Sequence, residues 1–475
     1  MSGVALERPS EGLFSFVGGL KGKFWAHIER PDAYIRALRV ATPLASQEWL
    51  WNDRRLLHRL DSLERFALWK GEEWRADKEV EETRRAFLKG LRETVGPRIK
   101  EMPDDGERRR VNQWLARLEA RLGVVDPYCR PSRARLELTD ACNLRCRMCP
   151  QSFWEWDRNY AEEWILERAR SLYPWLLQLD YTSFGETLLA PLFKQALLEA
   201  PTHAHTVLIS NGLLINDDWA QFLVENHLSE LHVSIDAASR GAYQAMRGVD
   251  AFERVVENAK RLVGVKKRLG KSSPTLVFNF TLTRKNIDDL VPLIRLAAEI
   301  GFQRVHMNYL MVWIAENSED SVFWIRDRAC EAVDEADRVA RELGVEYFHP
   351  PKLLREHEGV ERFETFCPEA WEIIYLRSMG KVSVCCMSAD EFVPPPEMSW
   401  EEVWDSPAYQ AFRRRVNLPG DQAPPLCRNC FYGRDVQPGD PRFHFFSEAL
   451  VEHLKDTPKH PYLTEPREAF SPAGL

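Results

Sequence analysis

Two groups of cysteines stand out in this sequence of 475 residues, which contains ten cysteines in all. The first group is Cys142, Cys146 and Cys149. The second lies nearer the C-terminus and comprises Cys367, Cys385, Cys386, Cys427 and Cys430. Cysteines at this low overall density do not make a disulfide scaffold, and clustered thiols in a reducing compartment are typical of metal ligands. The sequence therefore predicts two metal centres.

The first group lies in a loop that follows a short apolar segment, and its thiols are spaced four and three residues apart. Such a loop can place three thiolates round one face of an iron–sulfur cube, each on a different iron. The fourth iron then has no ligand from the loop, and a small molecule can coordinate there and react. A structural zinc ion normally takes four protein ligands with cysteines in pairs. We therefore expect an iron–sulfur cluster here rather than zinc or simply buried thiols.

The elements that must position this loop begin near residue 133, where short β-rich segments alternate with amphipathic helical patterns. Strands are predicted at 136–139, 179–184, 206–210, 231–235, 275–283 and 304–310, and helices at 162–177, 219–226, 252–265 and 290–300. Repeated β-then-α units predict a parallel sheet with helices on its outer face. Six units are too few for a closed eight-unit barrel. We therefore expect an α/β fold with a partial (β/α)6 parallel barrel, whose site lies at the C-terminal strand ends.

Composition divides the chain into four parts. Residues 1–130 are predicted as a helical N-terminal region, with helices at 56–74, 78–95 and 108–122, that could bind substrate or a partner. Residues 131–350 form the barrel, and 351–435 a small C-terminal domain in which Ser399 and Glu402 have the form of a capping box. Residues 436–475 are a tail rich in proline and aromatic residues.

The strand, the C-x3-C-x2-C loop and the partial barrel resemble a radical S-adenosylmethionine (SAM) enzyme. The resemblance implies a [4Fe–4S] cluster on Cys142, Cys146 and Cys149, whose open iron is chelated by the amine and carboxylate of SAM. It further implies that reduction cleaves SAM to a 5′-deoxyadenosyl radical, which removes a hydrogen atom from the substrate. The family often has an aromatic residue before the third cysteine, near the adenine. Here that residue is Met148, which still offers an apolar, polarizable surface.

Other segments at predicted strand ends are similar to the motifs of this family. Gly185 and Glu186 resemble its glycine–glutamate motif, in which the carboxylate binds the ammonium group of SAM, although Thr187 stands where the family usually has proline. Asn211 belongs to a turn that the family places near the cofactor. The resemblance assigns contacts with the ribose or carboxylate of SAM to Ser234 and Arg247, which singly would fit a helix cap and a surface ion pair.

The second group has the spacing C-x12-G-x4-C followed by C-x2-C. By spacing alone it fits zinc or a cluster with four protein ligands equally well. It resembles the auxiliary-cluster domain of the SPASM/twitch branch, in the shorter twitch form, because no cysteine follows Cys430. The resemblance implies a second [4Fe–4S] cluster, with Cys386 as a possible substitute for Cys385. The implied ligands are Cys367, Cys385, Cys427 and Cys430.

Composition and charge limit the functions further. The net charge of −8 and a pI near 5.9 argue against a protein that coats nucleic acid or anionic membranes. The first twelve residues lack the pattern of a signal peptide, and no apolar run approaches the ~20 residues of a membrane span. We therefore expect a soluble, cytoplasmic protein.

The sequence specifies the machinery more closely than the substrate. The resemblance favours oxidative modification of a peptide (a crosslink, dehydrogenation or epimerisation) in natural-product maturation, with an electron donor such as flavodoxin or ferredoxin. One alternative is dehydrogenation of an aminocyclitol or sugar alcohol, and another is a non-catalytic, zinc-stabilised binding protein. No general acid or base can be named, although several polar strand residues could point into the barrel. These are Tyr181, His232, Asn279, His306 and Asn308.

Overall fold

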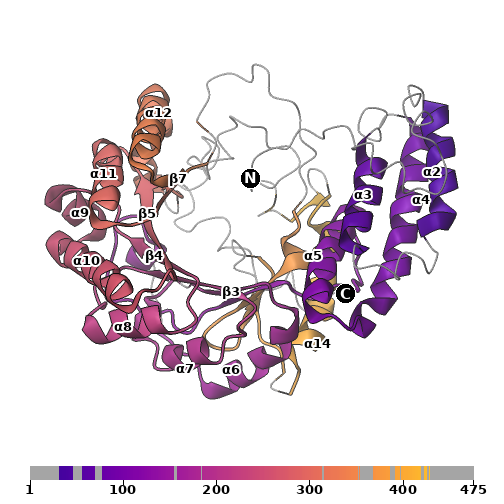
Figure 1. Cartoon of the computed structure of the whole chain (residues 1–475), viewed down its shortest axis with the longest axis horizontal. Coiled ribbons are helices and arrows are strands. Elements are labelled where there is room, and N and C mark those ends of the chain that lie inside the picture. Colours follow the sequence, from indigo (N-terminus) through magenta and orange to yellow (C-terminus); the bar gives the residue numbers. More distant parts are fainter. Residues whose placement is uncertain are drawn as a thin grey trace. The chain divides into compact units, whose positions relative to one another are not determined.

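The computed structural model describes most of the chain between residues 31 and 427, which is the part considered below. The described residues are 31–45, 56–69, 77–153, 158–182, 184–312, 315–350, 352, 367–385, 391–395, 397–418, 422–424 and 427. The chain divides into two compact units, residues 1–132 and 133–475, which are coloured along the sequence in Figure 1. Each unit is described by itself.

The first unit is helical, as its apolar spacing predicts. Its elements are α2 (Pro31–Ala45), α3 (Leu56–Trp69), α4 (Lys78–Val95), the 3₁₀ helix η3 (Gly96–Glu101) and α5 (Asp105–Leu122). Helix α4 packs against the other three α-helices. The fully buried Glu119 of α5 binds Arg92 of α4 at 2.7 Å and also accepts the backbone N–H groups of Tyr128 and Cys129, so its charge is compensated.

The second unit is built on a single sheet of ten strands in the order β10-β9-β8-β1-β2-β3-β4-β5-β6-β7. Neighbouring strands from β8 to β7 are parallel, whereas β9 and β10 are antiparallel additions. The strands are β1 Arg133–Leu136, β2 Gln178–Tyr181, β3 His205–Ser210, β4 Glu230–Ser234, β5 Thr275–Leu282, β6 Arg304–Tyr309, β7 Glu346–Phe348, β8 Ile373–Leu376, β9 Val382–Ser383 and β10 Glu391–Phe392.

Helices between the parallel strands lie along one face of this sheet (Figure 1). They are α6 Glu163–Ala169, α7 Phe193–Leu198, α8 Asp217–Glu225, α9 Arg240–Arg247, α10 Phe252–Leu269, α11 Leu290–Ile300 and α12 Arg326–Leu343. The C-terminal part adds α13 Glu369–Glu372, α14 Trp400–Trp404 and α15 Pro407–Arg415. The predicted partial (β/α)6 barrel is therefore confirmed as the fold class, and β7 to β10 extend its sheet.

The two faces of the sheet differ in chemistry. Side chains alternate between faces along a strand, and on β4 the positions of Leu231 and Val233 are at most 1% exposed. The opposite face carries Glu230, His232 and Ser234 on the same strand. The inner face of β4 is therefore polar, whereas closed barrels fill this space with branched apolar residues.

Several predicted elements differ in their bounds from those observed. Strand β2 ends at Tyr181 rather than at 184, α5 begins at Asp105 rather than at 108, α8 is displaced by one or two residues, and α10 continues to Leu269 rather than ending at 265.

The first strand and the first helix of the barrel also differ. The first strand is β1, three residues before the predicted 136–139, because the backbone from Arg133 onward pairs in parallel with both β2 and β8. The helix predicted at 162–177 ends as α-helix at Ala169 and continues as a 3₁₀ segment that contains Pro174, since proline lacks the N–H that an α-helix interior needs.

Other local predictions are confirmed. Ser399 and Glu402 form the capping box that opens α14. Helices α4 and α11 have the predicted bounds. Among the helices that the structure describes, none combines the length and the apolar character needed to cross a membrane.

Candidate active site

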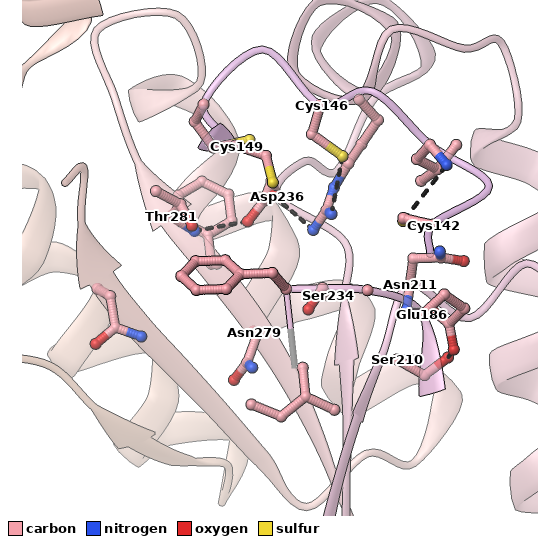
Figure 2. A pocket seen from close by; sticks show the side chains of 18 residues that line it. Cys142, Cys146, Cys149, Glu186, Ser210, Asn211, Ser234, Asp236, Asn279 and Thr281 are labelled. Carbon is pink, nitrogen blue, oxygen red and sulfur yellow. Dashed lines mark hydrogen bonds and ion pairs between the residues drawn. The ribbon is translucent and has the colours of Figure 1, made fainter. Parts of the chain in front are cut away.

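A cavity of about 260 Å³ lies at the C-terminal ends of the parallel strands. The thiols of Cys142, Cys146 and Cys149 line one side of it. The rest is lined by the segment after β2, the ends of β3 to β6 with residues that follow β3 and β4, and Arg247 of α9. In Figure 2 the three cysteines lie along a loop above the strand ends, with Ser234 and Asn279 below them. The loop and the strand-end segments predicted to hold the site are thus brought together.

The cysteine loop is held on one side by the segment after β2. Gly185 approaches the loop backbone so closely that a Cβ atom there would lie 2.5 Å from the carbonyl oxygen of Ala141 and 2.6 Å from that of Thr139. The next amide, Glu186 N, donates to Ala141 O at 2.8 Å. Gly185 is therefore required by backbone contact at the site, and no side chain fits in its place.

The C-terminal end of α9 holds the loop on the other side. Arg147 N donates to Met246 O at 2.9 Å, which satisfies a carbonyl of the last helical turn. Gly248 follows with φ of 75° and lies against the carbonyl oxygen of Arg145. Within the loop, Cys149 N and the Ser152 hydroxyl both donate to Cys146 O, at 3.0 and 2.7 Å.

Arg247, the last residue of α9, connects the loop to β4. Its Nη1 lies 3.5 Å from Cys146 Sγ, and its Nη2 lies 2.5 Å from a carboxylate oxygen of Asp236. Both charged side chains are buried, and Asp236 also accepts Thr281 N at 2.7 Å. Burial raises the pKa of Asp236, and the Arg247 charge opposes that rise. Burial disfavours the charged form of Arg247, but the neighbouring Asp236 carboxylate outweighs burial and holds the pKa of Arg247 above its usual value. Arg247 therefore presents a positive charge to the thiol.

Glu186 is buried and already makes three hydrogen bonds. Its Oε1 accepts the Ser210 hydroxyl at 2.8 Å and Leu188 N at 3.2 Å, and its Oε2 accepts Asn211 N at 2.7 Å. Burial raises its pKa, and these donors oppose the rise. A carboxylate accepts about four hydrogen bonds, so Glu186 retains capacity for one further donor in the cavity.

The side chain of Asn211 forms a hydrogen bond with the cysteine loop. Its Nδ2 donates to Asn143 Oδ1 at 2.7 Å, and its Oδ1 accepts Leu213 N at 3.0 Å. It therefore links the end of β3 to the residue after Cys142, although it also lines the cavity. The remaining predicted contact residues, Met148 and Ser234, line the cavity as well.

The prediction of site residues omitted Asp236, which lines the cavity and pairs with Arg247. Two signals pointed to it: an acidic residue directly after a strand end, and its place two residues after Ser234. Its backbone has φ of 57°, a conformation that aspartate tolerates better than most residues. Neither signal is specific, because Asp140 likewise follows a predicted strand directly.

The polar strand residues fall into three groups. Asn279 and Asn308 line the cavity. His232 and His306 lie one inward position nearer the start of their strands, outside the cavity lining. Tyr181 points to the helical face instead, where its hydroxyl donates to Ala196 O of α7 at 2.7 Å.

The donor set fits a thiolate-ligated cluster. Burial raises the pKa of Cys142, and it raises that of Cys149 to about 12, so these thiols ionise only when positive charge is bound to them. Iron supplies that charge, because metal binding displaces the thiol protons. Among the described residues, no three His, Cys, Asp or Glu side chains are arranged to hold a single metal ion.

The second cysteine group is described in part. Cys385 is 6% exposed and lies just after β9, and Cys367 N donates to Asn417 Oδ1 at 2.8 Å. Cys427 is also described, whereas Cys386 and Cys430 lie outside the described residues. Gly380, which lies between Cys367 and Cys385 in the sequence, has φ of 71°, and a Cβ atom there would meet the Trp164 ring.

Three neighbouring thiols, one buried and two half-buried, lie beside a polar cavity at the edge of a parallel sheet, and they define a site for an iron–sulfur cluster and a small polar ligand. Comparison with known proteins agrees with this interpretation of the site. Residues 136–297 match the model of the radical SAM superfamily, and residues 367–431 match that of the SPASM iron–sulfur cluster-binding domain. The chain therefore contains a radical SAM domain and a SPASM domain, and its cofactors are SAM and two iron–sulfur clusters.

The relatives carry several names. The chain is 28% identical over 287 residues to a "probable GTP 3′,8-cyclase" of Saccharolobus islandicus, covering 57% of this chain and 88% of that protein. It is 26% identical over 194 residues to a "tungsten-containing aldehyde ferredoxin oxidoreductase cofactor-modifying protein" of Pyrococcus furiosus, covering 40% of this chain and 54% of that protein.

Two solved structures share the fold. Streptococcus suis SuiB bound to S-adenosylmethionine superposes with a TM-score of 0.50 at 16% identity, covering 69% of this chain and 75% of SuiB. The anSMEcpe structure with bound AdoMet gives a TM-score of 0.50 at 16% identity and covers 69% of this chain and 98% of that one.

Proposed function

We propose that this protein is a radical SAM oxidoreductase that modifies a peptide, and that the cavity described above is its catalytic site. The observation that carries the proposal is the convergence of three thiols with a buried carboxylate and a buried guanidinium in one cavity at the strand ends. When bound together, the reduced cluster and SAM supply the chemistry to remove a hydrogen atom from an unactivated carbon. A flavodoxin or ferredoxin is the proposed electron donor.

Each of the site residues is proposed to have a different role in binding the cluster and SAM. Cys142, Cys146 and Cys149 hold the cluster, and the remaining acceptor capacity of Glu186 suits the ammonium group of SAM. Arg247 Nε is buried and has no hydrogen-bond partner among the described residues, which leaves it for an oxygen acceptor of the ligand. Ser234 offers a hydroxyl, Met148 an apolar surface, and Asn211 fixes the loop through Asn143. Gly185 allows the segment after β2 to lie close against the backbone of the cysteine loop.

The auxiliary cluster is proposed to take its ligands from Cys367, Cys385, Cys427 and Cys430, with Cys386 as the substitute for Cys385. Cys385 is already buried beside β9, as a cluster ligand in a small domain must be. A cluster with four protein ligands has no open iron. It suits electron transfer, so the net reaction is proposed to be a two-electron oxidation.

The cavity favours a substrate without clustered negative charge. Among its described lining residues Arg247 is the single cation, and it is neutralised by Asp236. A nucleoside triphosphate needs several cationic donors for its phosphates. Peptides are preferred as substrates on the resemblance to the SPASM/twitch branch, with aminocyclitols or sugar alcohols second. GTP stands third, supported by the name of the Saccharolobus relative.

The test uses the full-length protein after anaerobic reconstitution of its clusters. With SAM and dithionite, we expect formation of 5′-deoxyadenosine, and the triple variant Cys142→Ala, Cys146→Ala, Cys149→Ala should form none, since it has no open iron. No 5′-deoxyadenosine from the wild type would refute the proposed chemistry.

Candidate substrates are then compared in the same assay. Peptides encoded beside the gene, an aminocyclitol and GTP are each added, and products are weighed by mass spectrometry. The proposal predicts a peptide product lighter by two hydrogen atoms, from a crosslink or a dehydrogenation, whereas an epimerised peptide of unchanged mass would contradict the proposed two-electron oxidation. Conversion of GTP or the aminocyclitol in place of every peptide would overturn the peptide assignment.

A further inference from the structure

The inner face of the sheet continues beyond the cavity onto β6 and β7. Residues paired in register on neighbouring parallel strands point to the same face of a sheet. One such row consists of Ser234 on β4, Asn279 on β5, His306 on β6 and Phe348 on β7. The first two line the cavity, whereas His306 and Phe348 lie outside its lining. The row therefore leads from the cavity to β7, the last strand of the described sheet (Figure 1).

Phe348 offers apolar surface at the end of this row. Its side chain is 51% exposed, and the guanidinium carbon of Arg304 lies 5.0 Å from the centroid of its ring. Arg304 is itself bound by Glu230 at 3.0 Å and by Glu346 at 2.8 Å, so its charge is compensated. Exposed apolar surface next to a ligand cavity is typical of a binding site.

His306 lies between the cavity and Phe348 and is half-buried. No hydrogen bond joins either of its ring nitrogens to the residues that the structure describes. The titratable groups that face it are His232 and Glu230 of β4 and Arg304 of its own strand, and burial lowers its pKa to about 4. An uncharged imidazole has one donor and one acceptor. A peptide group has the same pair, so the two are complementary.

The spacing of the strands sets the position of these residues relative to the reacting atoms. Neighbouring strands lie about 4.8 Å apart, so Phe348 is roughly 10 Å from Asn279 across the sheet. Hydrogen abstraction requires contact with SAM, which places the reacting residue of a substrate over the cavity. Successive residues of an extended peptide are ~3.3 Å apart. A side chain that packs on Phe348 therefore belongs about three positions from the residue that reacts.

We propose that Phe348 and His306 form a substrate subsite, in which Phe348 binds an aromatic or aliphatic side chain of the peptide and His306 hydrogen-bonds to an adjacent peptide group. This inference rests on the proposed function, because it requires a peptide beside SAM. It narrows the substrate class to peptides with a large apolar residue near the reacting one. A sugar alcohol has neither the apolar side chain nor the peptide group.

Saturation-transfer NMR on the reconstituted full-length enzyme with SAM, under anaerobic conditions, tests the subsite without a known substrate. The probe is N-acetyl-phenylalaninamide, N-acetyl-glycinamide is the same probe without its side chain, and myo-inositol represents the sugar alcohols. We expect the phenylalanine probe to bind about ten-fold more tightly than the glycine probe. Equal binding of the two probes, or tighter binding of inositol, would overturn the proposal.

Variants of Phe348 locate the binding. Phe348→Ala should weaken binding of the phenylalanine probe by about five- to ten-fold and leave the glycine probe unchanged. Phe348→Tyr keeps the ring and should bind both probes as the wild type does. Leu198→Ala is the matched control, because it removes an apolar side chain that is 62% exposed on α7. Unchanged binding in Phe348→Ala, or an equal loss in Leu198→Ala, would reject the subsite.

His306→Ala tests the second part of the subsite. Both probes contain peptide groups, so the variant should weaken both by about three-fold through the loss of a hydrogen bond. Iron content equal to that of the wild type shows that each variant is folded. Unchanged binding of the glycine probe in folded His306→Ala would show that His306 does not bind the peptide group.

Failure of the proposed function gives a different result. If the reconstituted wild type forms no 5′-deoxyadenosine from SAM and dithionite, the radical chemistry is absent and both proposals fall. If it forms 5′-deoxyadenosine but binds the phenylalanine probe no better than Phe348→Ala does, the subsite alone is lost.

Discussion

Arg247 and Asp236 form an ion pair almost removed from water, with side chains 9% and 3% exposed. Arg240, at the start of the same helix, forms a second pair with Asp250 of the following loop, and this pair is exposed to solvent. Taking one partner from a buried pair leaves an uncompensated charge in the protein, whereas exposed ions are solvated by water. The two pairs therefore differ in energy although their residue types are the same.

We predict that Arg247→Gln destabilises the barrel by about 3–5 kcal/mol, which lowers the apparent melting temperature by roughly 5–15 °C. The variant should also bind SAM more weakly. Arg240→Gln is the matched control and should leave both properties near those of wild type. Differential scanning calorimetry and SAM titration measure them, and equal melting temperatures for the two variants would refute the argument.

At the residue scale the sequence identified the proposed cluster ligands better than the residues that hydrogen-bond to the site and hold it in place. Spacing singled out the three cysteines, because ligand types and intervals are local properties. The partners of Glu186 are Ser210 and the amides of Leu188 and Asn211, and Ser210 lies 24 residues away. Contacts of that kind depend on which strands are neighbours and on their register. Neither can be predicted from the residues of one short segment.

The segment after β2 shows how an element positions the site. Its close approach to the loop after β1 depends on Gly185, since a side chain there would enter the backbone of Thr139 and Ala141. Gly264 in α10 offers a contrast, because a Cβ built there meets nothing within 4 Å. The same substitution should therefore act oppositely at the two positions.

We predict that Gly185→Ala displaces the cysteine loop and reduces reconstituted iron from about eight to about four atoms per chain. Gly264→Ala should keep about eight and stabilise the protein by about 0.5–1 kcal/mol, because alanine favours the helix. Iron analysis and thermal unfolding provide the measurements. Full iron content in Gly185→Ala would show that the close approach is dispensable.

Element positions were predictable where periodicity was strong. Helix α11 has its predicted bounds, and β3 to β6 lie within one residue of prediction at both ends. Strand β8 was not predicted, although its four residues Ile373–Leu376 are all buried and pair in parallel with β1. A four-residue apolar segment has no diagnostic period, and its partner lies more than 230 residues earlier.

At the scale of the whole molecule, two cysteine groups far apart in the sequence belong to one compact unit, residues 133–475. The sheet joins them: β1 leads into the first cysteine loop, and β8 and β9, next to β1 on the other side, lead to Cys385. This continuity supports the proposal that the auxiliary cluster serves the same reaction as the first cluster. Because each cluster has its own ligands, a variant can lose one cluster and keep the other.

Cys427→Ala tests that separation. Removing one of four proposed ligands should lower iron from about eight to about four atoms per chain, because a cluster missing a ligand is exposed and lost. Since the first cluster and the SAM cavity are untouched, 5′-deoxyadenosine formation should continue while oxidised product disappears. Cys330→Ala, a cysteine of α12 outside both groups, should keep both iron and product. If Cys427→Ala retained product formation coupled to SAM cleavage, the C-terminal group would have no part in the oxidation.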